Sequence, residues 1–132
     1  VIIMAAAVAD FQPSKPESRK LKKSSKMTNL DLEPTHDFLI DLGEGKSPHQ
    51  TIVGFAAETE ELEKNAMEKL HKKNLDLIVA NDVSAPDVGF TYDTNEVLLL
   101  SPTQKKVVPL SSKRVVADKI LDAVLNLRKK KS

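Results

Sequence analysis

Two short apolar runs separated by a charged segment constrain the fold of this chain more than any other feature. Residues 51–57 (TIVGFAA) and 75–80 (LDLIVA) are apolar almost throughout, as is typical of strands buried on both faces. Residues 58–74 between them are acidic in the first turns and basic in the last, which favours a helix because this order matches the helix dipole. A strand, a helix and a strand in this order form a parallel crossover, so we predict a parallel sheet at the centre of the fold.

The segments on either side supply further elements. Before the central unit we predict an opening strand over 2–11, a short strand over 27–32, and a short helix over 34–43 that starts near Thr35 or Asp37.

After the central unit, residues 96–110 predict a hairpin that turns near residue 102, and residues 112–127 predict a final helix. Its apolar face consists of Val116, Ile120, Val124 and Leu127. The basic run 128–131 that follows is interpreted as solvated surface. The predicted fold is α/β, a Rossmann-like open sheet, mostly parallel, with a hairpin extension.

Composition narrows the classes of function. Twenty Lys and Arg residues against 19 Asp and Glu residues leave a net charge of +1, so neither nucleic acid nor an anionic membrane is expected as a partner. The absence of cysteine excludes disulfides and thiolate metal sites. No apolar run approaches the roughly 18 residues of a membrane span, and no signal peptide is visible, so a cytoplasmic location is expected. The chain begins inside a predicted strand, so we expect a single domain over residues 1–132 that is a piece of a longer protein.

Small residues gather where two of the predicted strands end. Ligands bind at the carboxyl ends of strands in open parallel sheets, and residues 5–7 (AAA) and 54–57 (GFAA) leave space there. The alanines either accommodate a ligand or let a helix pack closely, and Phe55 is either a stacking surface or a core ring. Asp10, after the first strand, could hold a metal ion or a ligand hydroxyl.

Basic side chains occur at two places that suit an anion. On a helical wheel, Lys69 and Lys73 lie within about 20° of Leu62, so they share the apolar stripe of the 58–74 helix and must direct their ammonium groups to an anion or to water. The loop 12–26 carries six basic residues, which could close over a polyphosphate or be simply solvated.

Other motif-like features do not support a site. Residues 45–47 (GKS) resemble the end of a phosphate loop, but Ile40 stands where its first glycine would be. The three histidines lack metal-ligand spacing, and no hydrolase triad can be assembled.

Several motifs in a fixed order resemble a known family. They are AAAVADF from residue 5, KLKK from residue 20, PTHDFL from residue 34, VGFAAET from residue 53 and KxxxKNLDLIVAND from residue 69. Together they resemble the phosphopantothenate-cysteine ligase of coenzyme A biosynthesis in its bacterial form. That form is usually the carboxyl-terminal half of a bifunctional protein whose other half is a flavin-dependent decarboxylase.

The resemblance implies a two-step ligation. The carboxylate of 4'-phosphopantothenate attacks the α-phosphate of CTP to give an acyl-cytidylate and pyrophosphate, and the amine of L-cysteine then displaces CMP. Mg²⁺ would neutralise charge on the triphosphate, and FMN is implied only if a decarboxylase domain precedes. The resemblance also implies a homodimer or higher oligomer, with part of the 96–110 hairpin as an interface.

The resemblance assigns the site residue by residue. It implies nucleotide contacts at Met4, Ala5, Ala6, Ala7, Asp10, Lys20, His36, Asp37, Phe38, Leu39, Phe55, Lys69 and Lys73. Lys20 matches the active-site lysine of the family, and Asp10 is the candidate Mg²⁺ ligand. His36 stands where many members have proline, which weakens that one assignment.

The resemblance further implies that the residues that hold phosphopantothenate lie upstream of this chain. Residues 1–132 would then be the carboxyl-terminal portion of a nucleotide-dependent ligase domain, with negligible activity alone. Two alternatives stay open. One is an inert nucleotide-binding or oligomerisation module with the same sheet, and the other is an oxidoreductase on a dinucleotide fold, although no GxGxxG is present.

Overall fold

The contacts within the chain divide it into two compact units. A computed structural model describes residues 1–6, 8–16, 18–20, 29–84 and 93–131. The first unit comprises Val1–Ala5 and Phe38–Ser132, and the second comprises Ala6–Asp37. The expectation of a single domain stays a prediction, and each unit is described by itself below.

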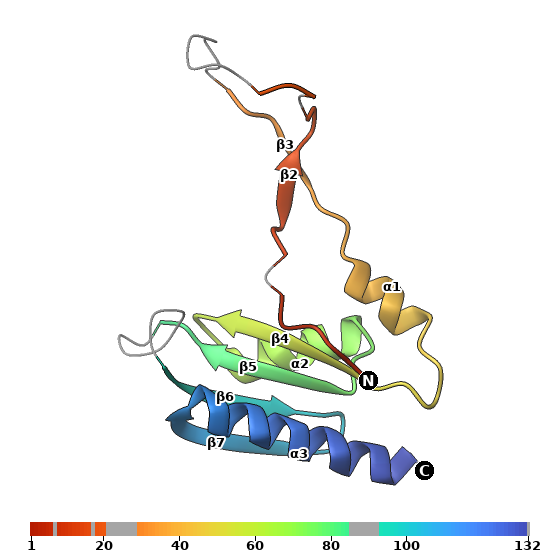
Figure 1. The fold of residues 1–132 in the computed structure, drawn as a ribbon, viewed down its shortest axis with the longest axis vertical. Coiled ribbons are helices and arrows are strands. Elements are labelled where there is room, and N and C mark those ends of the chain that lie inside the picture. The colour runs from red at the N-terminus through yellow and green to blue at the C-terminus, as the bar shows by residue number, and fades with distance from the viewer. Residues whose placement is uncertain (7, 17, 21–28, 85–92, 132) are drawn as a thin grey trace. The chain divides into compact units, whose positions relative to one another are not determined.

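The first unit is built on a five-stranded sheet (Figure 1). In spatial order its strands are β1 (Ile2–Ile3), β4 (Ile52–Glu58), β5 (Leu77–Asp82), β6 (Thr94–Leu100) and β7 (Lys105–Ser112). Strands β1, β4 and β5 are parallel, and β6 and β7 join antiparallel as a hairpin. The predicted Rossmann-like sheet with a hairpin extension is confirmed.

Helices cover both faces of this sheet. They are α1 (Phe38–Glu44), α2 (Leu62–Lys72) and α3 (Lys113–Lys131). Alternate residues of β4 point to opposite faces, so Ile52 and Ala56 join a core with α1 and α2, whereas Val53 joins a second core with α3. Figure 1 shows α2 and α3 on opposite sides of the sheet.

The predictions for the centre of the chain are confirmed, with shifted ends. Helix α2 begins at Leu62 rather than at residue 58, because β4 continues to Glu58 and Glu61 has a left-handed backbone with φ of 44°. Residues 34–43 do contain a helix, although Thr35 does not cap it; its hydroxyl donates to the carbonyl of Ala9 instead.

The predicted opening strand over 2–11 is wrong in extent. Ile2 and Ile3 pair with β4, and the amide of Met4 donates to the carbonyl of Val53 at 2.9 Å. The next paired residues along the described chain are Phe11–Pro13, and they pair with Leu32–Pro34 in the second unit instead of with the sheet.

The second unit is a two-stranded antiparallel ribbon of β2 (Phe11–Pro13) and β3 (Leu32–Pro34). The strand predicted over 27–32 is wrong in its bounds, because the observed strand begins at Leu32 and continues to Pro34. Residues 27 and 28 lie outside the described part of the chain. All six paired residues are exposed. A side-chain hydrogen bond of 2.9 Å from Gln12 to Glu33 crosses the ribbon.

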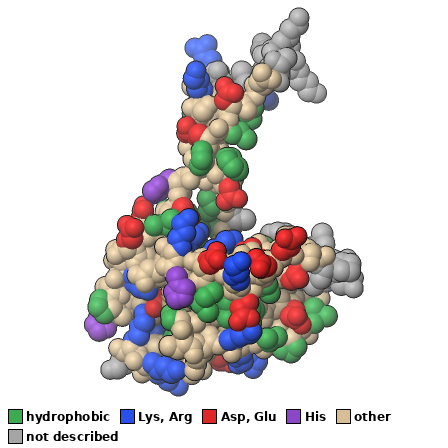
Figure 2. Space-filling view, turned by 180° about the vertical axis from the view of Figure 1, so that it is seen from behind, with side chains coloured by type: hydrophobic (Ala, Val, Ile, Leu, Met, Phe, Trp, Pro, Cys, Tyr) green, Lys and Arg blue, Asp and Glu red, His purple; other side chains and the backbone are tan. Residues whose placement is uncertain are grey.

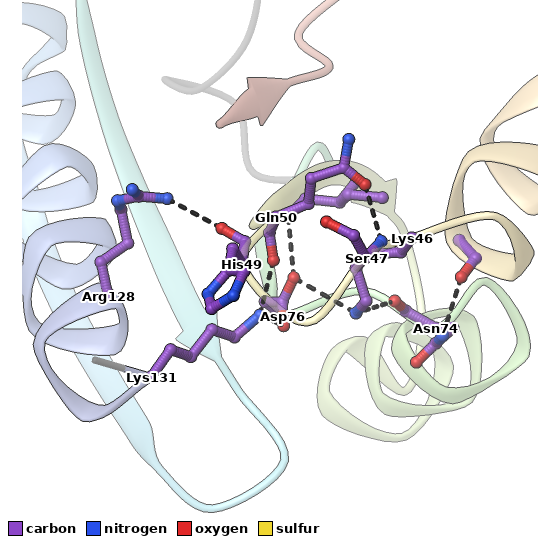
Figure 3. Close-up of polar contacts among 10 residues, drawn as sticks. Lys46, Ser47, His49, Gln50, Asn74, Asp76, Arg128 and Lys131 are labelled. Carbon is purple, nitrogen blue, oxygen red and sulfur yellow. Dashed lines mark hydrogen bonds and ion pairs between the residues drawn. The ribbon is translucent and has the colours of Figure 1, made fainter.

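A polar cluster closes the sheet at the amino ends of β4 and β5 (Figure 3). The carboxylate of Asp76 accepts the amide of Ile52 at 2.8 Å, and it pairs with the ammonium of Lys131 at 2.7 Å and that of Lys46 at 3.2 Å. Arg128 also donates to the carbonyl of His49 at 3.2 Å. The interpretation of 128–131 as solvated surface is therefore wrong for Lys131, whose side chain is 28% exposed and paired with Asp76. Arg128 stays exposed although it contacts the loop before β4.

The same cluster explains the phosphate-loop-like residues 45–47. The ammonium of Lys46 donates to the carbonyl of Asn74 at 2.7 Å in addition to pairing with Asp76. Lys46 thus lies at the edge of the sheet away from the carboxyl ends of the parallel strands, where it stabilises the fold.

Gly43→Ala tests the close approach between α1 and the end of α2. A Cβ at Gly43 would lie 2.0 Å from the carbonyl oxygen of Lys73, so the backbone must shift. We expect the free energy of unfolding to fall by about 2 kcal/mol in urea denaturation. Gly45→Ala is the matched control, because its Cβ would lie 3.4 Å from Asp41 and should change stability by less than about 0.5 kcal/mol.

Asp76→Asn tests the polar cluster. Partial burial alone would raise the pKa of Asp76, but hydrogen bonds from Lys131 and Ile52 and the charge of Lys46 lower it below its ordinary value of 3.8. The ionised carboxylate therefore stabilises the folded state above that value, and the contribution is lost as the pH falls through the lower folded-state pKa. We expect a loss of about 2 kcal/mol at pH 7.

The pH profile separates this effect from a general weakening. The difference in unfolding free energy between the wild type and Asp76→Asn should be constant above about pH 5 and shrink below about pH 4. Asp118→Asn is the control, since Asp118 is an exposed residue of α3 paired only loosely with Arg114 at 3.7 Å. A difference that persists unchanged at pH 2 would contradict the assignment.

Candidate functional site

The carboxyl ends of β4 and β5 lie side by side in the first unit. The two strands are in register from Val53 to Glu58, so Glu58 lies beside Asp82. The carbonyl of Glu58 also accepts the amide of Val83 at 3.0 Å, which fixes the end of β4 to the chain that leaves β5. This edge is where ligands bind in open parallel sheets.

An ion pair joins this edge to α2. The ammonium of Lys69 lies 2.6 Å from Oε1 of Glu58, and the side chain of Glu58 is only 12% exposed whereas that of Lys69 is 45% exposed. The amide group of Asn65 approaches Oε2 of Glu58 at 3.5 Å and donates to the carbonyl of Glu60 at 2.9 Å. Neither Glu58 nor Asn65 is among the site residues that the sequence motifs single out. An acidic residue directly at the end of a buried strand was the available signal.

The small residues of β4 have two different environments. On the face of α2, a Cβ at Gly54 would lie 2.6 Å from the side chain of Leu75, so Leu75 fills the space that the glycine leaves. Ala56 is buried in the same core. Close packing therefore explains these two residues.

The opposite face of β4 is open at its carboxyl end. Phe55 follows Val53 on the face of α3 by strand alternation, yet its side chain is 42% exposed and Ala57 is exposed as well. The alternative that Phe55 is a core ring is wrong. Phe55 and Lys69 thus lie on opposite faces of the same strand end, because α2 packs on the other side.

The remaining predicted residues of the first unit lie at its margin. Met4 packs against the core beside α2, and Ala5 is exposed. In α1, Leu39 is buried in the core whereas Phe38 is 38% exposed. Leu39 is thus part of the packing, whatever else it does.

Lys73 ends α2. Its amide donates to the carbonyl of Lys69 at 3.0 Å, and its side chain is half-buried. The two lysines of the apolar stripe therefore lie one turn apart along the helix. The ion pair with Glu58 shows that the side chain of Lys69 extends toward the carboxyl end of β4.

The second unit carries the rest of the predicted site. Its described members are exposed, and they are Ala6, Asp10, Lys20, His36 and Asp37. The alternative that alanines permit close helix packing has no support at Ala5 and Ala6, since both are exposed. Ala7 lies outside the described residues, as do Lys22, Lys23 and Lys26 of the basic loop.

The acidic residues form no metal centre within the described ranges. Within the described ranges, no three His, Asp or Glu side chains lie together as metal ligands. A single exposed carboxylate such as that of Asp10 suits Mg²⁺ bound mainly through phosphate and water oxygens. Asp10 as a Mg²⁺ ligand stays a prediction.

On the face of the first unit that Figure 2 shows, no large patch of a single charge is seen. Basic and acidic side chains are interspersed there over the first unit. None of the helices in the described part of the chain is both long enough and apolar enough to cross a membrane.

Comparison with known proteins identifies the family. The family model described as DNA/pantothenate metabolism flavoprotein C-terminal domain matches residues 1–127. This chain belongs to the DNA/pantothenate metabolism flavoprotein C-terminal domain family. The resemblance found in the sequence motifs is thereby confirmed at the level of the family.

Curated relatives within this family are longer than the chain. The coenzyme A biosynthesis bifunctional protein CoaBC of Bacillus subtilis (strain 168) is 45% identical over 130 residues, covering 98% of this chain and 32% of the relative. CoaBC of Escherichia coli (strain K12) is 35% identical over 128 residues, covering 95% and 32%. A cysteine/cysteine sulfinic acid decarboxylase from an unknown prokaryotic organism is 38% identical over 128 residues, covering 96% and 36%. The chain thus spans about a third of the length of these relatives.

Solved structures of the family share the fold. The C-terminal domain of CoaBC superposes with a TM-score of 0.72 at 33% identity, covering 95% of this chain and 53% of that one. A Cab2 mutant in complex with phosphopantothenate-cysteine gives a TM-score of 0.69 at 26% identity, covering 96% and 43%. The Rossmann-like α/β assignment therefore agrees with an experimentally determined fold.

Phe55→Ala tests whether this ring is free of the core. We expect the free energy of unfolding to fall by less than about 1 kcal/mol, because a core phenylalanine replaced by alanine costs about 3–5 kcal/mol. Leu70→Ala on α2, where the side chain is 1% exposed, is the positive control and should cost about 2–5 kcal/mol. An equal loss of unfolding free energy for the two variants in urea denaturation would show that Phe55 is part of the core.

Proposed function

We propose that this chain is part of a ligase that joins 4'-phosphopantothenate and L-cysteine in coenzyme A biosynthesis. The observation that carries this proposal is the family relationship to CoaBC, with 45% identity over 98% of the chain. A second support is the Cab2 neighbour, whose structure contains phosphopantothenate-cysteine and which shares the fold over 96% of this chain. A cytoplasmic location is part of the same proposal.

The proposed reaction activates a carboxylate before an amide is formed. A carboxylate oxygen of phosphopantothenate attacks the α-phosphorus of CTP, and the bond from that phosphorus to the bridging oxygen breaks to release pyrophosphate. The cysteine amine then attacks the acyl carbon of the cytidylate, loses a proton and expels CMP. Activation is needed because a free carboxylate is a poor electrophile toward an amine.

The charge and the position of each described residue suggest a separate role for it in this reaction. Lys69 presents an ammonium at the carboxyl ends of the parallel strands, where a triphosphate would lie. Phe55 offers an exposed ring on the other face of β4 against which a base could stack. Lys20, exposed in the second unit, supplies a cation for the negative charge that develops at the phosphorus during cytidylyl transfer.

The remaining members of the proposed nucleotide set act as contacts rather than as reacting groups. They are Met4, Ala5, Ala6, Ala7, Asp10, His36, Asp37, Phe38, Leu39 and Lys73. If Mg²⁺ is present, Asp10 is the side chain proposed to hold it, and the ion would supply charge neutralisation on the phosphates. We further propose a homodimer or higher oligomer, and FMN only if a decarboxylase domain is part of the same protein.

Lys20→Ala in the intact protein that contains this chain tests the proposed catalytic role. Loss of a cation that stabilises the transition state should lower the rate of CTP-dependent pyrophosphate release by about 100-fold or more. Lys15→Ala is the matched control, because Lys15 is an exposed lysine of the same basic loop, and its rate should stay within twofold of the wild type.

The outcomes distinguish the ligase from its alternatives. CTP binding without amide formation by the wild type would favour the inert nucleotide-binding module. Release of CO₂ from cysteine, the activity in the name of one relative, would favour a decarboxylase. An unchanged rate for Lys20→Ala in an active ligase would remove Lys20 from the catalytic set.

A further inference from the structure

We propose that Glu58 is a positioning residue of the nucleotide site, which holds the ammonium of Lys69 at the strand ends so that it can bind a phosphate of the nucleotide. This inference rests on the proposed function, and it adds a residue outside the set that the sequence motifs assign.

Backbone contacts hold Glu58 in position. It is the last residue of β4, it is in register with Asp82 of β5, and its carbonyl accepts the amide of Val83 at 3.0 Å. A strand end paired on this side has little freedom to move, and the side chain is 12% exposed. The carboxylate is therefore a fixed point beside the more exposed lysine.

Both oxygens of this carboxylate face α2. Oε1 lies 2.6 Å from the ammonium of Lys69, and Oε2 lies 3.5 Å from the amide nitrogen of Asn65. Asn65 is itself held by its bond to the carbonyl of Glu60 at 2.9 Å. The carboxylate thus receives Lys69 from one side while Asn65 limits its rotation.

The neighbouring acid does not compete for this lysine. Oδ1 of Asp82 accepts both the hydroxyl of Ser84 at 2.6 Å and the amide of Ser84 at 2.8 Å, so this carboxylate is oriented toward the residues that follow β5. These bonds also lower the pKa of Asp82 below its ordinary value. Lys69 is consequently directed to Glu58.

The exposed fractions of the two side chains indicate whether Glu58 positions Lys69 for an anion or only neutralises its charge. Glu58 is 12% exposed and Lys69 is 45% exposed, so an anion that arrives from solvent meets the ammonium before the carboxylate. An ammonium has three N–H donors, and among the described residues its one hydrogen-bond acceptor is Glu58. The other two donors can serve a phosphate oxygen. Since a free lysine side chain loses much rotamer freedom when it is fixed, a lysine that is already held binds the anion at lower entropic cost.

The experiment uses the intact protein and measures CTP binding by isothermal titration calorimetry beside steady-state kinetics. Glu58→Gln keeps the shape and an acceptor oxygen but removes the charge that holds Lys69. We expect CTP binding to weaken about fivefold or more, with KM for CTP raised to match and kcat changed by less than twofold. Glu58→Asp, which keeps the charge but is one methylene shorter, should show a smaller loss.

The matched control is Glu63→Gln. Glu63 is also paired with a lysine, Lys105, but both side chains are more than half exposed and the pair lies between α2 and the start of β7. Loss of this carboxylate changes the net charge as Glu58→Gln does, so CTP binding within twofold of the wild type would exclude a general charge effect. Thermal melting of each variant reports any loss of folding.

A double-mutant cycle with Lys69→Met decides whether Glu58 acts through the lysine. We expect Glu58→Gln to weaken CTP binding no further when Lys69→Met is already present. Independent, additive losses would overturn the inference, as would unchanged or tighter binding in Glu58→Gln. If Lys69→Met weakens binding and Glu58→Gln does not, the positioning role fails while the proposed function stands. If the wild type binds no CTP and forms no amide, the proposed function itself fails.

Discussion

The carboxylate of Asp76 is the contact on which the arrangement of the first unit depends. It lies just before β5, accepts the first amide of β4, and binds two lysines that come from the loop before β4 and from the last turn of α3. One side chain therefore joins both central strands to the helix that covers one face of the sheet. Removal of this carboxylate would leave the ammonium groups of Lys46 and Lys131, both largely buried, without their anion. An unpaired charge in a partly buried position lowers the stability of the folded state.

The two edges of the sheet differ in what their charges do. At the amino ends of β4 and β5, Asp76 is 12% exposed and Lys131 is 28% exposed, and their contacts are made within the protein. At the carboxyl ends, Glu58 is equally sheltered but Lys69 is 45% exposed. The first arrangement stabilises the fold, and the second leaves a cation available to a ligand. This difference agrees with the general rule that open parallel sheets bind ligands at their carboxyl ends.

The small residues of β4 show how far sequence reasoning reached. The run GFAA suggested one cleared space, but strand alternation divides it between two faces. Gly54 makes room for Leu75 in the core, whereas Phe55 lies exposed on the face of α3. The alternation of side chains between the two faces of a strand can be read from the sequence. Which of the two faces a helix covers completely cannot.

The opening segment failed as a prediction for a related reason. Its apolar run is long enough for a strand, but among the described residues of this run the pairing with β4 covers Ile2 and Ile3 and ends with the bond from Met4 to Val53. The chain then enters the ribbon of the second unit. Strand extent depends on the length of the neighbouring edge, which is not a local property of the run. The hairpin and the final helix were predicted well because both form from residues close in sequence.

The sequence by itself determined the central strand, helix and strand, the apolar face of α3, and the family, since hydrophobic periods and ordered motifs are local properties of the chain. The tertiary structure alone decided the partners of the charged residues. Lys69 meets a carboxylate 11 residues away and Lys131 meets one 55 residues away. Such pairs depend on how the helices lie on the sheet, because an ammonium on a long flexible side chain binds whichever anion the packing brings within its reach.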